Sequence, residues 1–234
     1  MKPRPLAVAT GLVAICLFLI GLQLDDPLLV FIAKPLPVTV MAGIAWRWGQ
    51  GRYARYITAG LAVCVLGDVL LELNYLQPDV KGTFVGGMVA FLLGHVAYTL
   101  AFLTITKSFK PAAMLPFAVW IVWVIVSVWD GLGALQIPVT MYVMAIFVML
   151  WRAASIAASR EEPRWYDWAV MVGAIVFGFS DTLIALNKFH RSIEGVRTPI
   201  ILTYWVGQAL LCASTMRPAS ESERGLRTAP VSET

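Results

Sequence analysis

Residues 83–106 read TFVGGMVAFLLGHVAYTLAFLTIT, 24 residues without a charged side chain. An α-helix of about 20 mainly apolar residues crosses the roughly 30 Å hydrocarbon core of a bilayer. The whole chain shares this character, with 59% hydrophobic and 14% charged residues, against about 45–50% and about 25% in soluble globular domains. The sequence therefore predicts an integral membrane protein and excludes an ordinary soluble one.

Seven further apolar runs lie before and after this stretch, joined by short connections with turn signals such as Asp130-Gly131. We therefore expect an all-α, polytopic membrane bundle of eight transmembrane helices, at residues 6–24, 28–46, 56–73, 83–106, 111–129, 132–151, 168–186 and 199–216. The first run follows Lys2 and Arg4 as in a signal peptide, but it has no small-x-small cleavage site and is expected to be retained. Residues 1–217 would form one transmembrane domain, and residues 218–234 a disordered, polar, cytoplasmic tail.

The loops on the N-terminal side carry thirteen of the Lys and Arg residues outside the spans, and the opposite loops carry four. Cytoplasmic loops are enriched in these residues, so both termini are predicted to lie in the cytoplasm, with the bundle in a bacterial-type inner (cell) membrane. The net charge of +4 thus reflects loop asymmetry and predicts no nucleic-acid partner. The outer loop from Lys188 to Arg197 is basic, which goes against this trend. Binding of a lipid headgroup phosphate would explain its charge, and a few stray charges would explain it equally well.

The three cysteines, Cys16, Cys64 and Cys212, lie within apolar runs. They have neither the pattern of a disulfide framework nor the spacing of a metal site, and we interpret them as core residues. No convincing ligand cluster is found elsewhere, so the sequence predicts neither a metal nor a cofactor.

Several polar residues lie inside the predicted spans, where a charge is costly and usually lines a functional cavity. Lys34, Asp68 and Asp181 are each five or six residues from the outer end of a span, which places them about 8–9 Å deep at ~1.5 Å per residue. Gln208 and His95 enter from the same side, about 14 and 18 Å down their spans. This clustering predicts a polar cavity that opens toward the outer leaflet.

Local spacing supports a built site. Two prolines in Lys34-Pro35-Leu36-Pro37 disfavour a continuous helix there, and a broken helix at membrane depth is tolerated where it lines a cavity. Glu72 shares a helix face with Asp68, although it is near enough to the interface to be incidental. Tyr98 lies three residues after His95, and taken singly each is as well explained by packing or hydrogen bonding.

An internal repeat relates the two halves of the chain. Residues 68–74 and 181–187 both fit the pattern D-x-L-x-x-L-N, and equivalent positions 21 residues after each Asn hold His95 and Gln208. The repeated helices lie four spans apart, which predicts a parallel 4+4 internal repeat about an axis along the membrane normal. Asp68 and Asp181 would then face each other across this axis.

These motifs, taken in order, resemble the YhhN family, also called the lysoplasmalogenase family, over nearly the whole chain to Met216. The resemblance rests on KPLP at 34–37, GDxxL at 67–71, GxxxFxxxHxxY at 87–98, Pro138 with Tyr142, the run from Gly173 through Ser180-Asp181 to Leu183, and Tyr204 with Gln208. It implies an eight-helix bundle and an ether hydrolase. The substrate would be a lysophospholipid, a lysoplasmalogen whose 1-alkenyl ether bond is cleaved to a fatty aldehyde and a glycerophosphoethanolamine or glycerophosphocholine.

The polar residues suit this chemistry, in which protonation of the alkene carbon produces an oxocarbenium-like cation that water then attacks. Paired carboxylates divide such work in glycosidases, and burial with a neighbouring like charge keeps one of two carboxyls protonated. Our hypothesis is that Asp68 and Asp181 form this acid and base pair, in either order. The residues expected to bind or orient substrate, water or the carboxyls are Lys34, Asn74, His95, Tyr98, Tyr142, Ser180, Asn187, Tyr204 and Gln208.

Two other classes of protein share some of these features. A small proton-coupled transporter also combines parallel repeats, broken helices and intramembrane carboxylates, but its site would lie near the midplane with access from both sides. A sensing or purely structural membrane protein would leave the two aspartates unexplained. The oligomeric state, the preferred headgroup and the chain length are open at this point.

Overall fold

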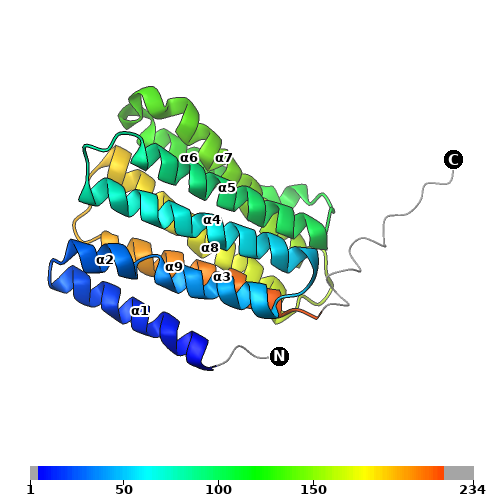
Figure 1. Ribbon diagram of the computed structural model, residues 1–234. Coiled ribbons are helices and arrows are strands. Elements are labelled where there is room, and N and C mark those ends of the chain that lie inside the picture. Colours follow the sequence, from blue (N-terminus) through cyan, green and yellow to red (C-terminus); the bar gives the residue numbers. More distant parts are fainter. Residues whose placement is uncertain (1–4, 219–234) are drawn as a thin grey trace.

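The computed structural model describes residues 5–218. Within this range the chain forms nine α-helices packed as one bundle, in which the second and third follow each other end to end (Figure 1), and no strand. They are α1 (Pro5–Gln23), α2 (Pro27–Ala33), α3 (Leu36–Trp48), α4 (Gly51–Leu76), α5 (Thr83–Ile105), α6 (Leu115–Val128), α7 (Gln136–Ala157), α8 (Trp165–Ala185) and α9 (Arg197–Ala213). The predicted all-α class is confirmed.

Seven helical segments are long and apolar enough to cross a membrane: 27–48, 51–76, 83–105, 111–131, 133–157, 165–190 and 197–216. They correspond to the last seven of the eight expected spans, because each apolar run carries enough consecutive helix-compatible residues to reach across a bilayer. The first expected span is a shorter apolar helix, Ala7–Gln23, within the described residues. Of the expected polar tail, residues 219–234 lie outside the described residues.

The second span is broken, as its prolines predict. Asp26 caps α2 by accepting hydrogen bonds from the backbone N–H groups of Leu28 and Leu29, and α2 ends at Ala33. The helix then restarts at Leu36, because Pro35 has no N–H to continue the α2 ladder. Lys34 therefore lies at a break between two helices, where its side chain reaches the interior and is only 11% exposed.

Helices α4 and α5 pack closely along their length, and so do α8 and α9. A Cβ atom at Gly94 would lie 2.7 Å from Sγ of Cys64, and one at Gly207 would lie 2.9 Å from the carbonyl oxygen of Gly173. Glycines at these contacts let the backbones approach, as small residues do between membrane helices. The resulting four-helix centre holds the buried polar side chains in fixed positions.

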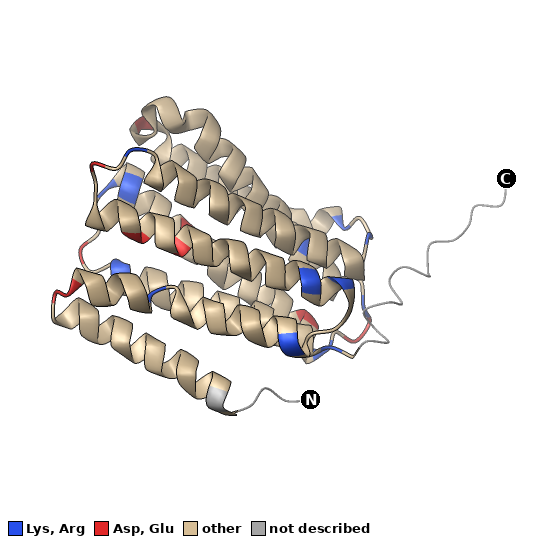
Figure 2. Ribbon diagram, viewed as in Figure 1, with Lys and Arg blue, Asp and Glu red and all other residues tan. Residues whose placement is uncertain are grey.

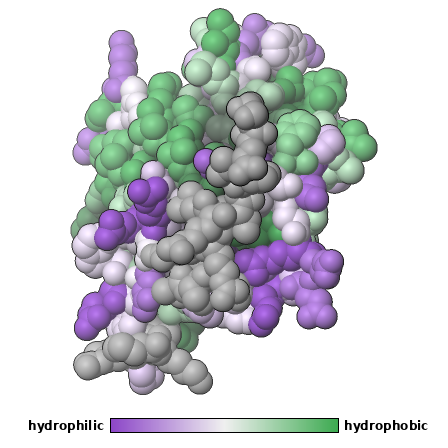
Figure 3. Space-filling model, turned by 90° about the vertical axis from the view of Figure 1, so that its right-hand side faces the viewer, coloured by the Kyte–Doolittle hydropathy of each residue, from purple (hydrophilic) through white to green (hydrophobic). Residues whose placement is uncertain are grey.

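A buried ionic cluster joins the start of α8 to the segment after α9. Asp167, which is 0% exposed, accepts a hydrogen bond from the backbone N–H of Arg164 and lies 3.3 Å from Nε of Arg160 and 3.6 Å from Nη2 of Arg217. This cluster is at the end of the bundle where the described chain begins and ends (Figures 1 and 2). Basic residues gather at this end (Figure 2), and hydrophilic side chains cover both sides of it in the end-on view of Figure 3.

Candidate active site

Asp181 is held between three helices. It projects from α8, and its Oδ2 atom accepts a hydrogen bond of 3.0 Å from the hydroxyl of Tyr142 on α7. The same oxygen lies 3.0 Å from Nε2 of His95 on α5. Because both contacts use Oδ2, they fix the carboxyl group while leaving Oδ1 without a hydrogen-bond partner among residues 5–218.

The surroundings of His95 bear on its contact with Asp181. Nδ1 of His95 lies 2.7 Å from the carbonyl oxygen of Phe91, and because a carbonyl only accepts, Nδ1 carries a proton. A lone pair on Nε2 and an ionised Oδ2 would repel each other at 3.0 Å, although Oδ2 lies off the axis of the ring N–H bond. A second proton, on either Nε2 or the Asp181 carboxyl, would remove this repulsion.

The imidazole has no freedom to turn away from this carboxyl. His95 is 0% exposed, and its ring stacks on that of Phe177, with centroids 4.6 Å apart and an interplanar angle of 15°. The ring of Tyr142 meets it edge-on at 5.3 Å. These contacts hold His95, Tyr142 and Asp181 in one arrangement.

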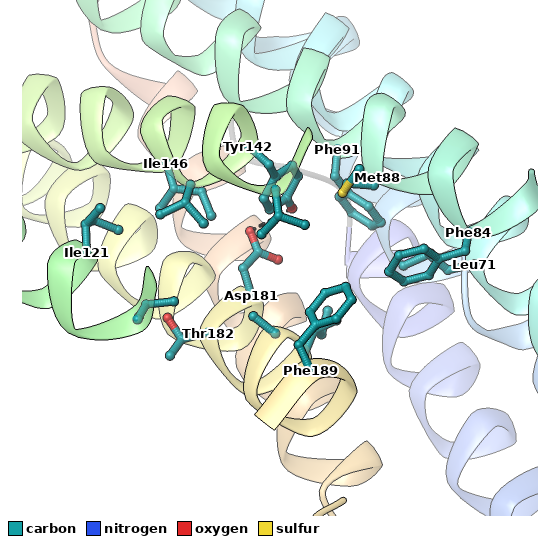
Figure 4. A pocket seen from close by; sticks show the side chains of 15 residues that line it. Leu71, Phe84, Met88, Phe91, Ile121, Tyr142, Ile146, Asp181, Thr182 and Phe189 are labelled. Atoms are coloured by element: carbon teal, nitrogen blue, oxygen red, sulfur yellow. Dashed lines mark hydrogen bonds between the residues drawn. The ribbon is translucent and has the colours of Figure 1, made fainter. Parts of the chain in front are cut away.

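Asp181 opens onto a mainly apolar pocket between α5, α6, α7 and α8 (Figure 4). The Asp181 carboxyl points toward Tyr142 in the middle of the pocket, with Phe84 and Met88 on one side and Ile121 on the other (Figure 4). The lining is otherwise apolar apart from Thr182. Such a cavity suits a hydrocarbon chain that brings one reactive group to a single carboxyl.

Asp68 is the centre of a second, separate group. It lies on α4, is 1% exposed, and its Oδ2 atom accepts a hydrogen bond of 2.8 Å from the hydroxyl of Tyr204 on α9. Among residues 5–218 the structure gives no hydrogen bond between Asp68 and Asp181, so each carboxyl has its own tyrosine. Asp68 also does not line the apolar pocket that Asp181 lines.

Aromatic contacts link the surroundings of the two aspartates, because Tyr204 hydrogen-bonds to Asp68 and Phe177 stacks on His95. The rings of Phe91, Phe177 and Tyr204 meet one another at centroid distances of 5.6–6.4 Å. Tyr98 donates a hydrogen bond of 2.6 Å to Oε1 of Gln208, and Nε2 of Gln208 is buried without a partner among the described residues. The Gln208 amide therefore retains donor capacity inside the bundle.

A second, more polar pocket adjoins the first and shares Leu71, Phe84 and Ile184 with it. The polar residues in its lining are Lys34, Asn74, Tyr75, Asn187, Lys188 and Arg197. Glu72, 2% exposed, lies 3.1 Å from Nζ of Lys34 through Oε2 and pairs with Arg197 through Oε1. The ion pairs place both cations where α2, α4 and α9 meet.

The structure thus distributes the predicted site residues over several places. Asp181, His95 and Tyr142 come together, Asp68 pairs with Tyr204, and Tyr98 pairs with Gln208. Asn74 and Asn187 use Oδ1 to accept hydrogen bonds from Thr83 and from the Ile193 backbone, so each fixes a helix end beside the polar pocket. Ser180 donates to the carbonyl oxygen of Ile200, which ties α8 to α9.

One residue beside these groups was not singled out from the sequence. Phe177 stacks on His95, and one aromatic residue in an apolar run gives no signal of such a role. Arg197 and Lys188 line the polar pocket, and the basic loop between them was the signal that pointed there. No group of three or more His, Cys, Asp or Glu side chains within residues 5–218 is arranged to hold a metal ion.

Comparison with known proteins gives a consistent result. A family model described as the YhhN family matches residues 29–215. The chain is 31% identical over 187 residues to a protein named lysoplasmalogenase from Mycobacterium tuberculosis, covering 77% of this chain and 67% of that protein. It is 32% identical over 168 residues to Homo sapiens lysoplasmalogenase TMEM86A, covering 70% and 66%, and 27% identical over 193 residues to Homo sapiens lysoplasmalogenase TMEM86B, covering 80% and 75%. No solved structure matches the chain.

Proposed function

The chain belongs to the YhhN family, and from this premise we propose that it hydrolyses the vinyl ether bond of a lysoplasmalogen within the membrane. The products would be a fatty aldehyde and a glycerophosphoethanolamine or glycerophosphocholine. Relatives named lysoplasmalogenase, of which the chain spans about two thirds, support this choice of reaction.

One observation carries the proposal: a carboxyl with one free oxygen faces an apolar pocket and lies 3.0 Å from a buried histidine. Oδ2 of Asp181 is occupied by Tyr142 and His95, so Oδ1 is the atom available to a substrate in the pocket that Asp181 lines. A general acid must lie within hydrogen-bond reach of the atom that it protonates. A vinyl ether whose chain occupies the apolar pocket meets this requirement.

The reaction begins when the Asp181 carboxyl protonates the alkene carbon farther from the ether oxygen. The electron pair of the double bond forms the new C–H bond, which leaves an oxocarbenium cation and an Asp181 carboxylate. This carboxylate lies beside the cation and stabilises it electrostatically, as preorganised charges do in low-dielectric sites. His95 and Tyr142 hold the carboxylate in place by their contacts with Oδ2.

Water then attacks the carbon bonded to the ether oxygen and returns one proton to Asp181. The hemiacetal collapses to the aldehyde, its hydroxyl proton is lost, and the departing glycerol oxygen takes up a proton. One water is consumed, and the carboxyl is restored. We assign to Asp68, the base of the predicted pair, the hydroxyl proton that the hemiacetal loses. Tyr204 is its hydrogen-bond partner, and the free amide of Gln208 can hold the water that carries this proton to it.

We propose that the predicted internal repeat relates the two carboxylates. Asp68 and Asp181 are 113 positions apart, since 181 minus 68 is 113. Phe91 and Tyr204 are separated by the same number, and their rings are in contact with centroids 5.7 Å apart. Equivalent residues that touch each other are expected on a pseudo-twofold axis, which would pass between these two rings.

Helix packing agrees with this axis. A Cβ at Gly94 would meet Cys64, and a Cβ at Gly207 would meet Phe177. These two contacts are equivalent in the repeat, because Gly207 lies 113 positions after Gly94 and Phe177 lies 113 positions after Cys64. In a parallel 4+4 repeat α3 is equivalent to α7, and α5 is equivalent to α9. A contact between α3 and α9 should then be matched by one between α7 and α5, and both contacts are present. We propose further that both termini lie in the cytoplasm, with the polar pocket at the outer side of the cell membrane.

The test uses the purified full chain in mild detergent with a synthetic 1-alkenyl lysophosphoethanolamine, and measures aldehyde release. Asp68→Asn and Asp181→Asn should each lower kcat by about 100-fold or more, as loss of a general acid or base does. Asp79→Asn, at an exposed aspartate between α4 and α5, is the matched control and should be fully active. Full activity in Asp181→Asn, or no aldehyde from folded wild type, would overturn the proposal.

A further inference from the structure

We propose that the polar pocket binds the phosphate of the lysolipid headgroup through Lys34, Lys188 and Arg197. The inference rests on the proposed function, because it names the part of the substrate that this second pocket takes. Nothing in the chemistry of vinyl ether cleavage requires the phosphate, so the site would serve recognition and positioning.

Charge is the first argument. Three cationic side chains line the pocket, and one carboxylate, Glu72, contacts two of them; three positive charges and one negative charge leave two positive charges unbalanced. Within residues 5–218, Lys188 has no carboxylate partner, and its Nζ lies over the Phe84 ring, 5.1 Å from the centroid. A phosphodiester carries one negative charge and strong acceptor oxygens, which suit such a cluster.

Donor geometry is the second argument. Arg197 offers five N–H donors, and among the described residues its pairing with Glu72 uses Nη2. Its guanidinium lies over the ring of Tyr75, 4.9 Å from the centroid, and the side chain is 41% exposed, so other donors remain open to the pocket. Guanidinium groups bind phosphate oxygens with two parallel hydrogen bonds, which gives direction as well as charge.

The position of the pocket is the third argument. Leu71, Phe84 and Ile184 line both pockets, so a single lysolipid would extend from the cations, past these residues, to Asp181. The backbone helps to bring the cations there: α8 ends in a π-helical turn, η4 (Leu186–His190), which carries Lys188. π-Helical turns are rare and occur frequently at functional sites.

The experiment measures binding without turnover. The probes are a saturated 1-O-alkyl lysophosphoethanolamine, which has no vinyl ether to cleave, and the 1-O-alkylglycerol with the same chain, which lacks the phosphate. Wild type in detergent should bind the phospholipid about 10- to 100-fold more tightly, the range expected for hydrogen bonds between charged groups. Arg197→Gln should remove most of this preference, and Lys188→Gln should reduce it.

Arg191→Gln is the matched control, because Arg191 is exposed in the same connection and does not line the pocket. Equal affinity of wild type for the two probes, or equal losses in Arg191→Gln and Arg197→Gln, would overturn the inference. Inorganic phosphate in large excess should not compete with the lipid; competition would assign the site to free phosphate instead. Aldehyde release measured in parallel separates the two proposals: activity without phosphate preference refutes only this site, whereas preference without activity refutes only the hydrolysis.

Discussion

The hydroxyl of Tyr142 offers a sharp test of the proposed proton donor. Tyr142→Phe removes one hydrogen bond of 3.0 Å to Oδ2 of Asp181 and keeps the ring that packs edge-on against His95. Once the proton has moved to the substrate, Asp181 is a carboxylate, and a hydrogen bond to a charged group is worth about 1.5–3 kcal/mol. At 1.36 kcal/mol for each factor of ten, kcat should fall by about 10- to 150-fold.

The assay is steady-state aldehyde release from a 1-alkenyl lysophosphoethanolamine at saturating substrate, with thermal unfolding in detergent as a check on folding. Tyr56→Phe is the matched control, because Tyr56 is 38% exposed on α4; its activity should be unchanged. A Tyr142→Phe enzyme with kcat within twofold of wild type, while Asp181→Asn is inactive, would show that Oδ2 is not held by this hydroxyl during proton transfer. The proton-transfer step would then need a different geometry.

Three further predictions concern the pocket and the bundle. Ile121→Trp should fill the end of the apolar pocket on α6. It should lower kcat/KM for long alkenyl chains about 10-fold more than for short ones, since each excluded methylene costs about 0.8 kcal/mol. An equal effect on all chain lengths would refute this. Gly131→Ala should lower the unfolding temperature and the activity together, because its Cβ would overlap the carbonyl of Phe189; an unchanged unfolding temperature would refute it. Asp167→Asn should destabilise the protein by about 3–5 kcal/mol, because it leaves the buried Arg217 without its carboxylate; denaturant unfolding that matches wild type would refute it.

Hydropathy predicts the spans well and their ends less well. Seven expected spans fall on long apolar helices because burial in hydrocarbon requires an unbroken run of apolar residues. Helix α4, however, begins at Gly51 instead of Tyr56, because a helix continues into polar residues wherever its backbone hydrogen bonds are satisfied. The break at Pro35 could be predicted, since the missing N–H is a property of the residue itself.

The contacts between side chains could not be read from the sequence. Depth along each span indicated that Asp68 and Asp181 belong to one side of the membrane, but depth carries no information on the rotation of each helix. Rotation decides that Asp181 meets His95, and that Glu72 pairs with Arg197, 125 positions away. The π-helical turn after α8 was also not predicted; in the structure its Phe189 carbonyl oxygen lies against Gly131.

The single unoccupied oxygen of Asp181 has a stereochemical consequence. Protonation turns the planar alkene carbon into a methylene group, and in heavy water this carbon receives one deuterium beside its original hydrogen. A carboxyl fixed at Oδ2 by Tyr142 and His95 delivers the deuteron from one side, so the two enantiotopic faces of the alkene are not equivalent in the pocket. The labelled aldehyde would form as one enantiomer, whereas protonation by free solvent would give a racemate.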